Sequence, residues 1–362
     1  MTAPTPRPGI LDIAPYVGGA AKAPGAARVY KLSSNESALG PSPKAAEAAR
    51  AAASSVHLYP DGSAAALREK IAEVHGLDAA RIVCGAGSDE LLQLLARAYL
   101  GPGDSAVQTR HGFLVYALAT QGCGAEIRFA PENNLTADID AILASIDETT
   151  RVVFLANPNN PTGTYIPDTE VRRLREAMPD GALLVLDAAY AEYMEAGDYD
   201  AGAALVDERD DTVMTRTFSK IYGLGGLRLG WAYCPAPVAD VLNRLRGPFN
   251  VSSAALAAGV AALEDQAFVA KNREHNRRER ERLAQQLARL GLDFQPSVGN
   301  FILVRFADAA TASVVQAALR AGGVIVREMA AYGLADCLRV SVGAEEANTR
   351  FIELLSEIVG AR

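Results

Sequence analysis

The sequence predicts an α/β fold in which a large domain, built on a mostly parallel seven-stranded sheet covered by helices, carries a smaller α+β domain. Two observations lead to this. The 362 residues exceed what one hydrophobic core usually supports. From about residue 80, seven short apolar runs alternate with helical patterns, and several runs are apolar throughout, as strands covered on both faces must be. The helices between the runs imply crossover connections between parallel strands.

The seven runs are the expected strands of the large domain, which we place at residues 42–285. In chain order they are Arg81–Cys84, Ser105–Gln108, Ala125–Phe129, Arg151–Leu155, Ala182–Leu186, Thr212–Met214 and Leu229–Tyr233. The Ala-rich stretch before them, at residues 45–53, predicts a helix.

The character of the chain changes after a long charged helix, expected from about Asp265 to Leu290. Residues 286–362 predict the smaller α+β domain. Its expected elements are a strand at 300–306, a helix at 311–321, short strands near Val324 and Leu338, and a closing helix from Glu345. The Pro/Gly-rich residues 1–41 are too few to fold alone, so we expect them to pack on this domain.

Composition narrows the possible partners. A formal net charge of -8 argues against nucleic acid and anionic membranes, because both require a broad basic surface. No apolar run approaches the roughly 20 residues of a membrane span, and the first nine residues lack the apolar core of a signal peptide. The four cysteines lie far apart, so we expect reduced thiols in a cytoplasmic protein and no metal site.

Polar residues stand where several predicted strands end. Ligands of open α/β sheets bind beyond these carboxyl ends, so the residues should meet at one edge of the sheet. The segments in question are Gly85–Glu90, Asn157–Gly163, Asp187 with Tyr190, and Thr217–Lys220. A phosphate-binding turn, an amide, a carboxylate and a lysine therefore converge.

Pyridoxal phosphate requires this set of groups. Its aldehyde needs a lysine amine, its ring nitrogen needs a carboxylate, and its phosphate suits a helix N-terminus with hydroxyls and an arginine nearby. The sequence offers Lys220, Asp187, the turn at residues 87–89, Ser219 and Arg228 for these tasks.

Each residue also has an ordinary interpretation, such as a surface lysine, a helix-capping aspartate or a tight turn. These ordinary interpretations are independent of one another. All of them would have to be true at once for residues that occur in this order along the chain. A dinucleotide-binding loop is a further alternative, since Gly223–Gly226 is glycine-rich. That fingerprint should follow a strand and open a helix, whereas these glycines lead into a strand, which disfavours a dehydrogenase.

Over nearly its whole length the chain resembles the fold-type I pyridoxal-phosphate aminotransferases. The segment Asn157–Gly163 resembles their Asn-Pro-x-Asn-Pro-Thr-Gly signature, and Thr217–Lys220 with Gly225–Arg228 resembles their lysine motif. Further segments are typical of the histidinol-phosphate aminotransferases among them: residues 32–36, 59–62, 87–90, 323–327 and 338–343.

The resemblance implies a role for each residue of the cofactor site. Lys220 would be the Schiff-base lysine and proton shuttle, and Asp187 would pair with the pyridinium nitrogen. Asn157 and Tyr190 would hydrogen-bond the ring oxygen, and Phe113 would stack on the ring. The phosphate would be held by Ser88, Asp89, Thr217, Ser219 and Arg228, with Tyr59 reaching in from the second subunit of a homodimer.

The resemblance also implies a substrate site and an activity. Arg339 would grip the anionic group of the substrate, and Arg327, Tyr16 and Asn35 would shape that pocket. The expected reaction is transamination of histidinol phosphate with 2-oxoglutarate and glutamate in histidine biosynthesis. Three alternatives stay open: an aromatic amino-acid aminotransferase with the same cofactor site, a decarboxylase of a phosphorylated amino acid, and a non-catalytic regulator on this fold. A regulator would need an appended DNA-binding domain, for which residues 1–40 are too few.

Overall fold

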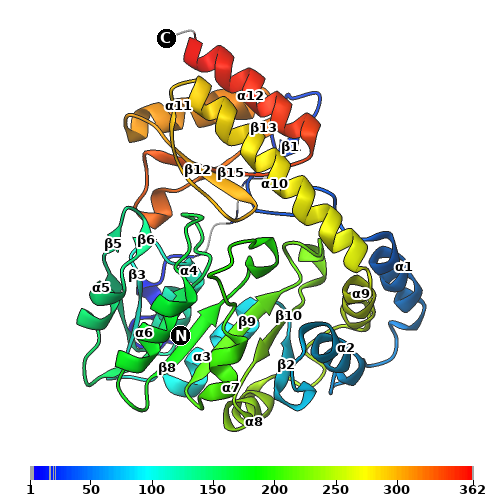
Figure 1. The fold of residues 1–362 in the computed structure, drawn as a ribbon, viewed down its shortest axis with the longest axis vertical. Helices are drawn as coiled ribbons and strands as arrows, with labels where there is room; N and C mark the ends of the chain where they lie inside the picture. Colours follow the sequence, from blue (N-terminus) through cyan, green and yellow to red (C-terminus); the bar gives the residue numbers. More distant parts are fainter. Residues whose placement is uncertain (1–3, 16–17, 19, 21, 361–362) are drawn as a thin grey trace.

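The computed structural model describes residues 4–15, 18, 20 and 22–360, and it has a larger and a smaller region (Figure 1). The larger region contains a seven-stranded sheet in the order β2-β10-β9-β8-β7-β3-β4. Its strands are β2 (Ile82–Gly85), β3 (Ser105–Thr109), β4 (Glu126–Ala130), β7 (Thr150–Ala156), β8 (Leu183–Asp187), β9 (Thr212–Thr217) and β10 (Gly230–Tyr233). All seven predicted strands are confirmed. Six run in the same direction, and β10 is antiparallel to both of its neighbours, β2 and β9.

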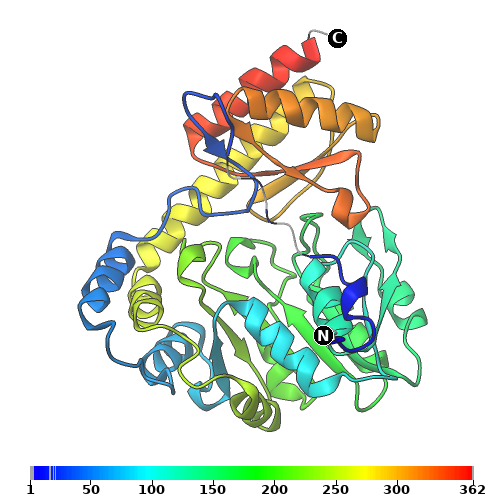
Figure 2. The same ribbon diagram turned by 180° about the vertical axis from the view of Figure 1, so that it is seen from behind.

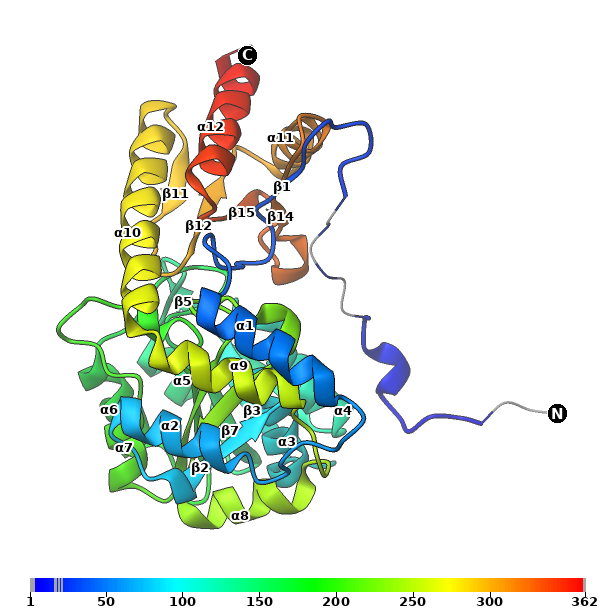
Figure 3. The same cartoon turned by 90° about the vertical axis from the view of Figure 1, so that its right-hand side faces the viewer.

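The central strands β7 and β8 are mostly apolar because successive side chains enter two different cores. In β7, Val152 and Phe154 pack on one face with α3, α4 and α8, while Val153 and Leu155 pack on the other with α5 and α6. The other strands alternate in the same way. The helices are α1 (Pro43–Ala52), α2 (Ala65–His75), α3 (Ser88–Tyr99), α4 (Leu114–Gly122), α5 (Ile139–Ala144), α6 (Asp168–Ala177), α7 (Ala203–Glu208), α8 (Ala236–Leu245) and α9 (Ser253–Glu264). Figure 2 shows α3 crossing one face, and Figure 3 shows α1 beside α9.

The smaller region is an antiparallel sheet in the order β11-β12-β15-β14, covered on one face by helices. Its elements are β11 (Asp293–Gln295), β12 (Phe301–Arg305), α11 (Ala309–Ala321), β13 (Val324–Ile325), β14 (Arg327–Glu328), β15 (Cys337–Ser341) and α12 (Glu345–Gly360). Along β15, Leu338 and Val340 enter the helix-covered core, so Arg339 and Ser341 belong to the opposite face. This alternation aims two polar residues toward the larger region.

The long helix α10 (Gln266–Arg289) joins the two regions, and it appears in yellow in Figure 1. The proposed boundary at residue 285 therefore falls inside a continuous helix. The N-terminal segment contacts both regions. Strand β1 (Tyr30–Lys31) pairs in parallel with β13, whereas Arg7 Nη2 donates a hydrogen bond to the carbonyl of Gly122 at the end of α4. Near η1 (Ile10–Asp12) the segment projects from the body of the chain (Figure 3).

Among the described residues, no helix is both long and apolar enough to cross a membrane. Gly225 and Gly226 lie in a three-residue 3-10 helix, η5 (Gly225–Leu227), which leads into β10, so this glycine-rich segment does not open an α-helix.

Candidate active site

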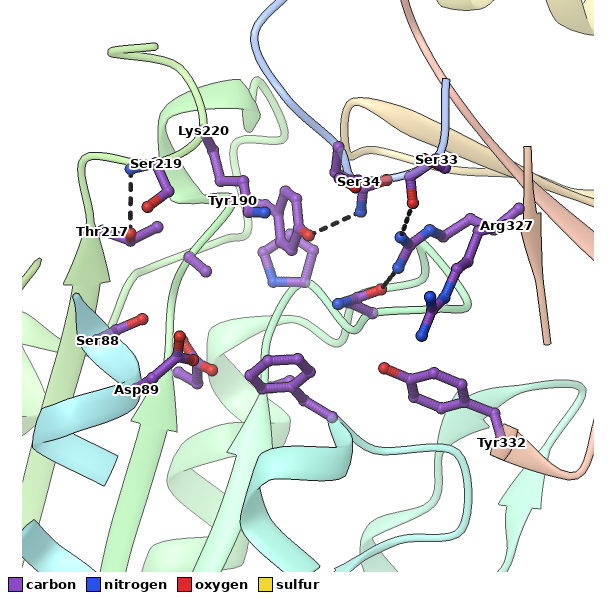
Figure 4. A pocket seen from close by; sticks show the side chains of 18 of the residues that line it. Ser33, Ser34, Ser88, Asp89, Tyr190, Thr217, Ser219, Lys220, Arg327 and Tyr332 are labelled. Carbon is purple, nitrogen blue, oxygen red and sulfur yellow. Dashed lines mark hydrogen bonds between the residues drawn. The ribbon is translucent and has the colours of Figure 1, made fainter. Parts of the chain in front are cut away.

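One cavity lies beyond the carboxyl ends of the central strands, between the larger and smaller regions (Figure 4). It gathers residues from the first 35 positions to the last 25 positions of the chain. Its lining residues are Ser33, Ser34, Asn35, Ser88, Asp89, Phe113, Ala156, Pro158, Asn160, Asp187, Ala189, Tyr190, Thr217, Ser219, Lys220, Arg228, Arg327, Tyr332 and Arg339. Twelve of the fifteen predicted site residues are in this list: Lys220, Asp187, Tyr190, Ser88, Asp89, Phe113, Thr217, Ser219, Arg228, Asn35, Arg327 and Arg339.

Lys220 lies three residues after the end of β9 and reaches into the cavity (Figure 4). Its Nζ lies 5.7 Å from the centre of the Tyr190 ring. Tyr190 is itself almost fully buried at the turn after β8, and burial raises the pKa of its phenol to about 12. The Lys220 side chain thus ends over the ring of a neutral phenol.

Asp187 ends β8 and is 5% exposed. Its Oδ2 accepts a hydrogen bond of 2.7 Å from the Tyr116 hydroxyl, and its Oδ1 accepts one of 3.2 Å from Thr215. Burial still raises the pKa of this carboxyl to about 6, because the two hydroxyls only partly offset the loss of water. A cationic partner in the cavity would restore the ionised form.

The N-terminus of α3 and the segment after β9 form a cradle lined with donors. No side chain caps the first turn of α3, which begins at Ser88. Gly87 has a φ of +86°, and a Cβ atom there would collide with the Arg228 guanidinium, so only glycine lets this arginine lie over the turn. Arg228 donates to Ser219 Oγ at 3.2 Å and pairs with Asp89 at 3.0 Å. An anion bound here would meet a helix N-terminus and a guanidinium.

The pairing of Asp89 with Arg228 bears on the prediction that Asp89 holds the phosphate. A carboxylate repels a phosphate, so the Asp89 side chain is suited to hold the arginine in place. Contact of Asp89 with a phosphate would have to come from its backbone N–H in the first turn of α3.

The smaller region contributes arginines to the other side of the cavity. Arg339 is 7% exposed, and its guanidinium donates to Asn160 Oδ1 and, at 3.0 Å, to the carbonyl of Ser33. Arg327, on β14, lines the same space near Tyr332 (Figure 4). Two guanidinium groups from one small sheet thus stand at the end of the cavity away from the α3 cradle.

Three predicted residues are placed differently from the rest. Asn157 is not among the lining residues, because its side chain amide is bonded at both ends to the backbone of Ile166, at 2.9 and 3.0 Å. Tyr59 lies on the surface, 83% exposed and stacked on Phe249 with ring centres 4.7 Å apart. Tyr16 lies outside the described residues.

The sequence analysis missed several residues of the site. Ser33, Ser34 and Asn160 lie within motifs that it quoted, so a residue-by-residue search of those motifs would have found them. Tyr116, which holds Asp187, lies three residues after Phe113 on the first turn of α4. Tyr332 follows no strand of the large sheet and belongs to no motif, and no sequence signal pointed to it.

The donor set fits pyridoxal phosphate on chemical grounds. A buried carboxylate short of a cation suits a protonated ring nitrogen, and an uncapped helix N-terminus with Arg228 suits a phosphate. Lys220, between them, can carry the aldehyde. Among the described residues there is no cluster of histidine, cysteine and carboxylate side chains that could hold a metal ion.

Comparison with known proteins agrees with this geometry. A sequence model of the family "Aminotransferase class I and II" matches residues 27–355. The histidinol-phosphate aminotransferase of Paramagnetospirillum magneticum is 56% identical, with 100% of both chains covered, and that of Rhodospirillum rubrum is 57% identical, covering 97% of this chain and 96% of the relative. The crystal structure of the Sinorhizobium meliloti histidinol-phosphate aminotransferase in complex with pyridoxal-5'-phosphate superposes with a TM-score of 0.87 at 28% identity, covering 92% of each chain. The chain belongs to the class I and II aminotransferase family.

Proposed function

We propose that this chain is an enzyme that transfers the amino group of histidinol phosphate to 2-oxoglutarate in histidine biosynthesis, with pyridoxal phosphate as cofactor. The observation that carries the proposal is one cavity that joins Lys220 and Asp187 to an anion cradle at one end and to Arg327 and Arg339 at the other. Full-length relatives at 56% and 57% identity are named for the same reaction. Both findings favour an enzyme over a regulator.

When bound, pyridoxal phosphate supplies an aldehyde that amines can condense with and a ring that withdraws electrons. Lys220 would hold the aldehyde through its Nζ, and as a free amine the same Nζ would take a proton from the substrate carbon and return one on the cofactor side. Asp187 keeps the ring nitrogen protonated, and Tyr116 and Thr215 keep that carboxylate in place. Tyr190 serves the ring oxygen, to which Asn157 can add only the second hydrogen of its Nδ2, and Phe113 covers the ring.

The cradle at the start of α3 holds the cofactor phosphate. Arg228 provides the charge, Ser88, Thr217 and Ser219 provide hydroxyls, and Asp89 fixes the guanidinium. In this role the ionic contacts hold the cofactor so that the lysine-linked end stays aligned with Asp187.

We propose that the active protein is a homodimer in which Tyr59 reaches the phosphate bound by the second subunit. Tyr59 is exposed together with Val56, Leu58 and Phe249, at 74%, 60% and 44%. Apolar residues gathered this way favour an interface between protein chains. We also propose a cytoplasmic location, which the four free cysteines support.

The substrate end of the cavity carries the specificity. Arg339 binds the anionic group of the donor through its planar guanidinium, with Arg327 as a second cation. Asn35 also lines this cavity. The aromatic amino-acid alternative uses the same cofactor groups, and it would place a carboxylate where histidinol phosphate places a phosphate.

A kinetic comparison tests the assignment. The purified holoenzyme should transaminate histidinol phosphate with a kcat/KM about 100-fold or more above that for phenylalanine, with 2-oxoglutarate as acceptor, because a dianion gains more from two arginines than a carboxylate does. Equal values for the two donors would move the assignment to an aromatic aminotransferase.

A further inference from the structure

The side chain of Asn35 is buried at the meeting point of three segments that lie far apart in the sequence. The residue is 1% exposed and has a left-handed backbone with a φ of +56°. Its backbone N–H donates to Ser341 Oγ of β15 at 2.8 Å, and its carbonyl accepts from Asn300 Nδ2 at 2.9 Å. Its side chain donates to the Tyr190 hydroxyl oxygen at 2.9 Å. The smaller region therefore holds Asn35 against a residue of the proposed cofactor site.

The hydrogen bonds around Asn35 decide which group donates in its contact with Tyr190. The Ser341 hydroxyl donates to Asn35 Oδ1 at 3.1 Å, which turns the Nδ2 end of the amide toward Tyr190. Nδ2 can only donate, so the phenol oxygen accepts. The phenol proton is then directed away from Asn35 and is available to an acceptor in the cavity that Tyr190 lines.

We propose that Asn35 is a positioning residue that directs the Tyr190 hydroxyl proton toward the ring oxygen of the cofactor. Ser341 orients Asn35, so this alignment depends on the smaller region being seated on the larger one. The inference rests on the proposed function, and it gives Asn35 a task distinct from contact with the substrate.

Several charged groups act on Tyr190 beside Asn35. Lys220 approaches its ring from the segment after β9, and Arg339 acts from β15. The carboxylates of Asp187, on β8, and Asp89, on α3, act in the opposite sense to Arg339. A test must therefore separate the direction of a hydrogen bond from a change in local charge.

The experiment is a double-variant cycle on holoenzyme: wild type, Asn35→Asp, Tyr190→Phe and the two combined. The measurement is the pH midpoint at which the visible absorption band of the bound cofactor changes. A hydrogen bond donated to the ring oxygen stabilises its negative charge and lowers this midpoint. An aspartate at position 35 can only accept, so it draws the phenol proton to itself. Asparagine and aspartate both tolerate a left-handed backbone, which favours correct folding of the variant.

We expect Asn35→Asp and Tyr190→Phe each to raise the midpoint by about one pH unit, the size of one hydrogen bond to a charged group. In the Tyr190→Phe background, Asn35→Asp should raise the midpoint by less than about half a pH unit. The added charge is present in both backgrounds, so it cancels in the cycle. An equal shift in both backgrounds, or no shift at all, would overturn the proposal.

Ser341→Ala provides a second variant if Asn35→Asp does not fold. It frees the amide to turn, and we expect a smaller rise that Tyr190→Phe abolishes; a rise that persists without the phenol contradicts the proposal. Failure of the proposed function gives a different result, because the visible band and its midpoint shifts would remain while the preference for histidinol phosphate over phenylalanine would be lost.

Discussion

The two sides of the cavity reach the same space by different routes. On the large-sheet side, Asp187, Thr217 and Lys220 lie at or just after the ends of neighbouring strands, so the topology of the sheet brings them together. On the small-sheet side, Arg339 is held by Ser33 and Asn160, which come from two distant segments. The first side depends on local motifs, and the second depends on how the regions are seated. Changes at Lys220 or Asp187 should therefore affect cofactor chemistry, and changes at Arg339 or Arg327 should affect substrate binding.

The largest effect is expected for Lys220→Ala, on the large-sheet side. Loss of the group that carries the aldehyde and moves the proton should lower kcat by at least about a thousandfold. Borohydride reduction of wild type should attach the cofactor to the peptide containing Lys220, and mass spectrometry should find no label in the variant. Lys271→Ala, an exposed position on α10, is the control and should keep both activity and label. A label on any other lysine would refute the assignment.

Asp187→Asn should lower kcat about 100-fold, since a neutral amide does not hold the ring nitrogen protonated. In the cofactor-free protein, the same substitution should raise stability at neutral and alkaline pH. Burial raises the Asp187 pKa from 3.8 to about 6, so the folded state binds more protons than the unfolded state between these values. The contribution of this carboxyl to stability is therefore present below pH 4 and lost as the pH rises through 6.

It follows that cofactor-free Asp187→Asn should be more stable than cofactor-free wild type at pH 8, by up to about 3 kcal/mol. At pH 4 the two proteins should be closer in stability. Thermal unfolding of both proteins at the two pH values measures this difference. A variant that is less stable at pH 8 would show that the carboxylate already has a sufficient partner within the chain.

Arg339→Ala tests the small-sheet side. Removing one member of a buried charged contact costs about 2–5 kcal/mol, which corresponds to a fall in kcat/KM for histidinol phosphate of roughly 30- to several-thousandfold. Cofactor affinity should be unchanged, as measured by absorbance titration. Arg339→Lys keeps the charge but loses the planar guanidinium, so its kcat/KM for histidinol phosphate should lie between those of wild type and Arg339→Ala.

A loss of cofactor affinity in Arg339→Ala would show that the small-sheet side also holds the cofactor, which contradicts the division of tasks between the two sides.

Arg327→Ala tests which substrate the small-sheet side is built for. The variant should lower kcat/KM for histidinol phosphate more than for phenylalanine, because a phosphate dianion gains more from a second cation than a carboxylate does. Equal losses for both donors would remove the reason for preferring the phosphorylated substrate.

The sequence predicted the large-sheet side better than the small-sheet side for a physical reason. Polar residues such as Asp187 stood out at the ends of apolar runs, and parallel strands end at one edge. Arg339 was also predicted, but through a resemblance and not from periodicity. Its partner Asn160 and its neighbour Tyr332 were missed, because contacts across the seam between regions leave no pattern in either segment.

Sequence reasoning also could not see competing hydrogen bonds. Asn157 was expected at the ring oxygen, yet its amide binds the backbone of Ile166 at both ends. Asp89 was expected at the phosphate, yet its carboxylate pairs with Arg228. A motif identifies the position of a residue, whereas the partner that satisfies its side chain depends on the folded chain around it.

The smallest effect is expected for Tyr59→Phe, which removes one hydroxyl from a residue that lies outside the cavity of its own chain. If the partner subunit's cofactor phosphate accepts a hydrogen bond from this hydroxyl, cofactor affinity should fall about tenfold. Sedimentation should give the same oligomeric state as for wild type, because the ring and its stacking on Phe249 of the same chain remain. Tyr165→Phe is a matched control, since that hydroxyl contacts Asp198 on the surface.

A hybrid dimer decides whether Tyr59 acts across the interface. One subunit carries Lys220→Ala and the other carries Tyr59→Phe. If Tyr59 serves the opposite subunit, the only site with a lysine is also served by an intact tyrosine, so its cofactor affinity should equal that of wild type. If Tyr59 serves its own subunit, that same site lacks the hydroxyl and should bind the cofactor about tenfold more weakly, as the Tyr59→Phe homodimer does. Wild-type affinity in the hybrid therefore requires a site built from two chains, and the weaker value would return Tyr59 to the chain that carries it.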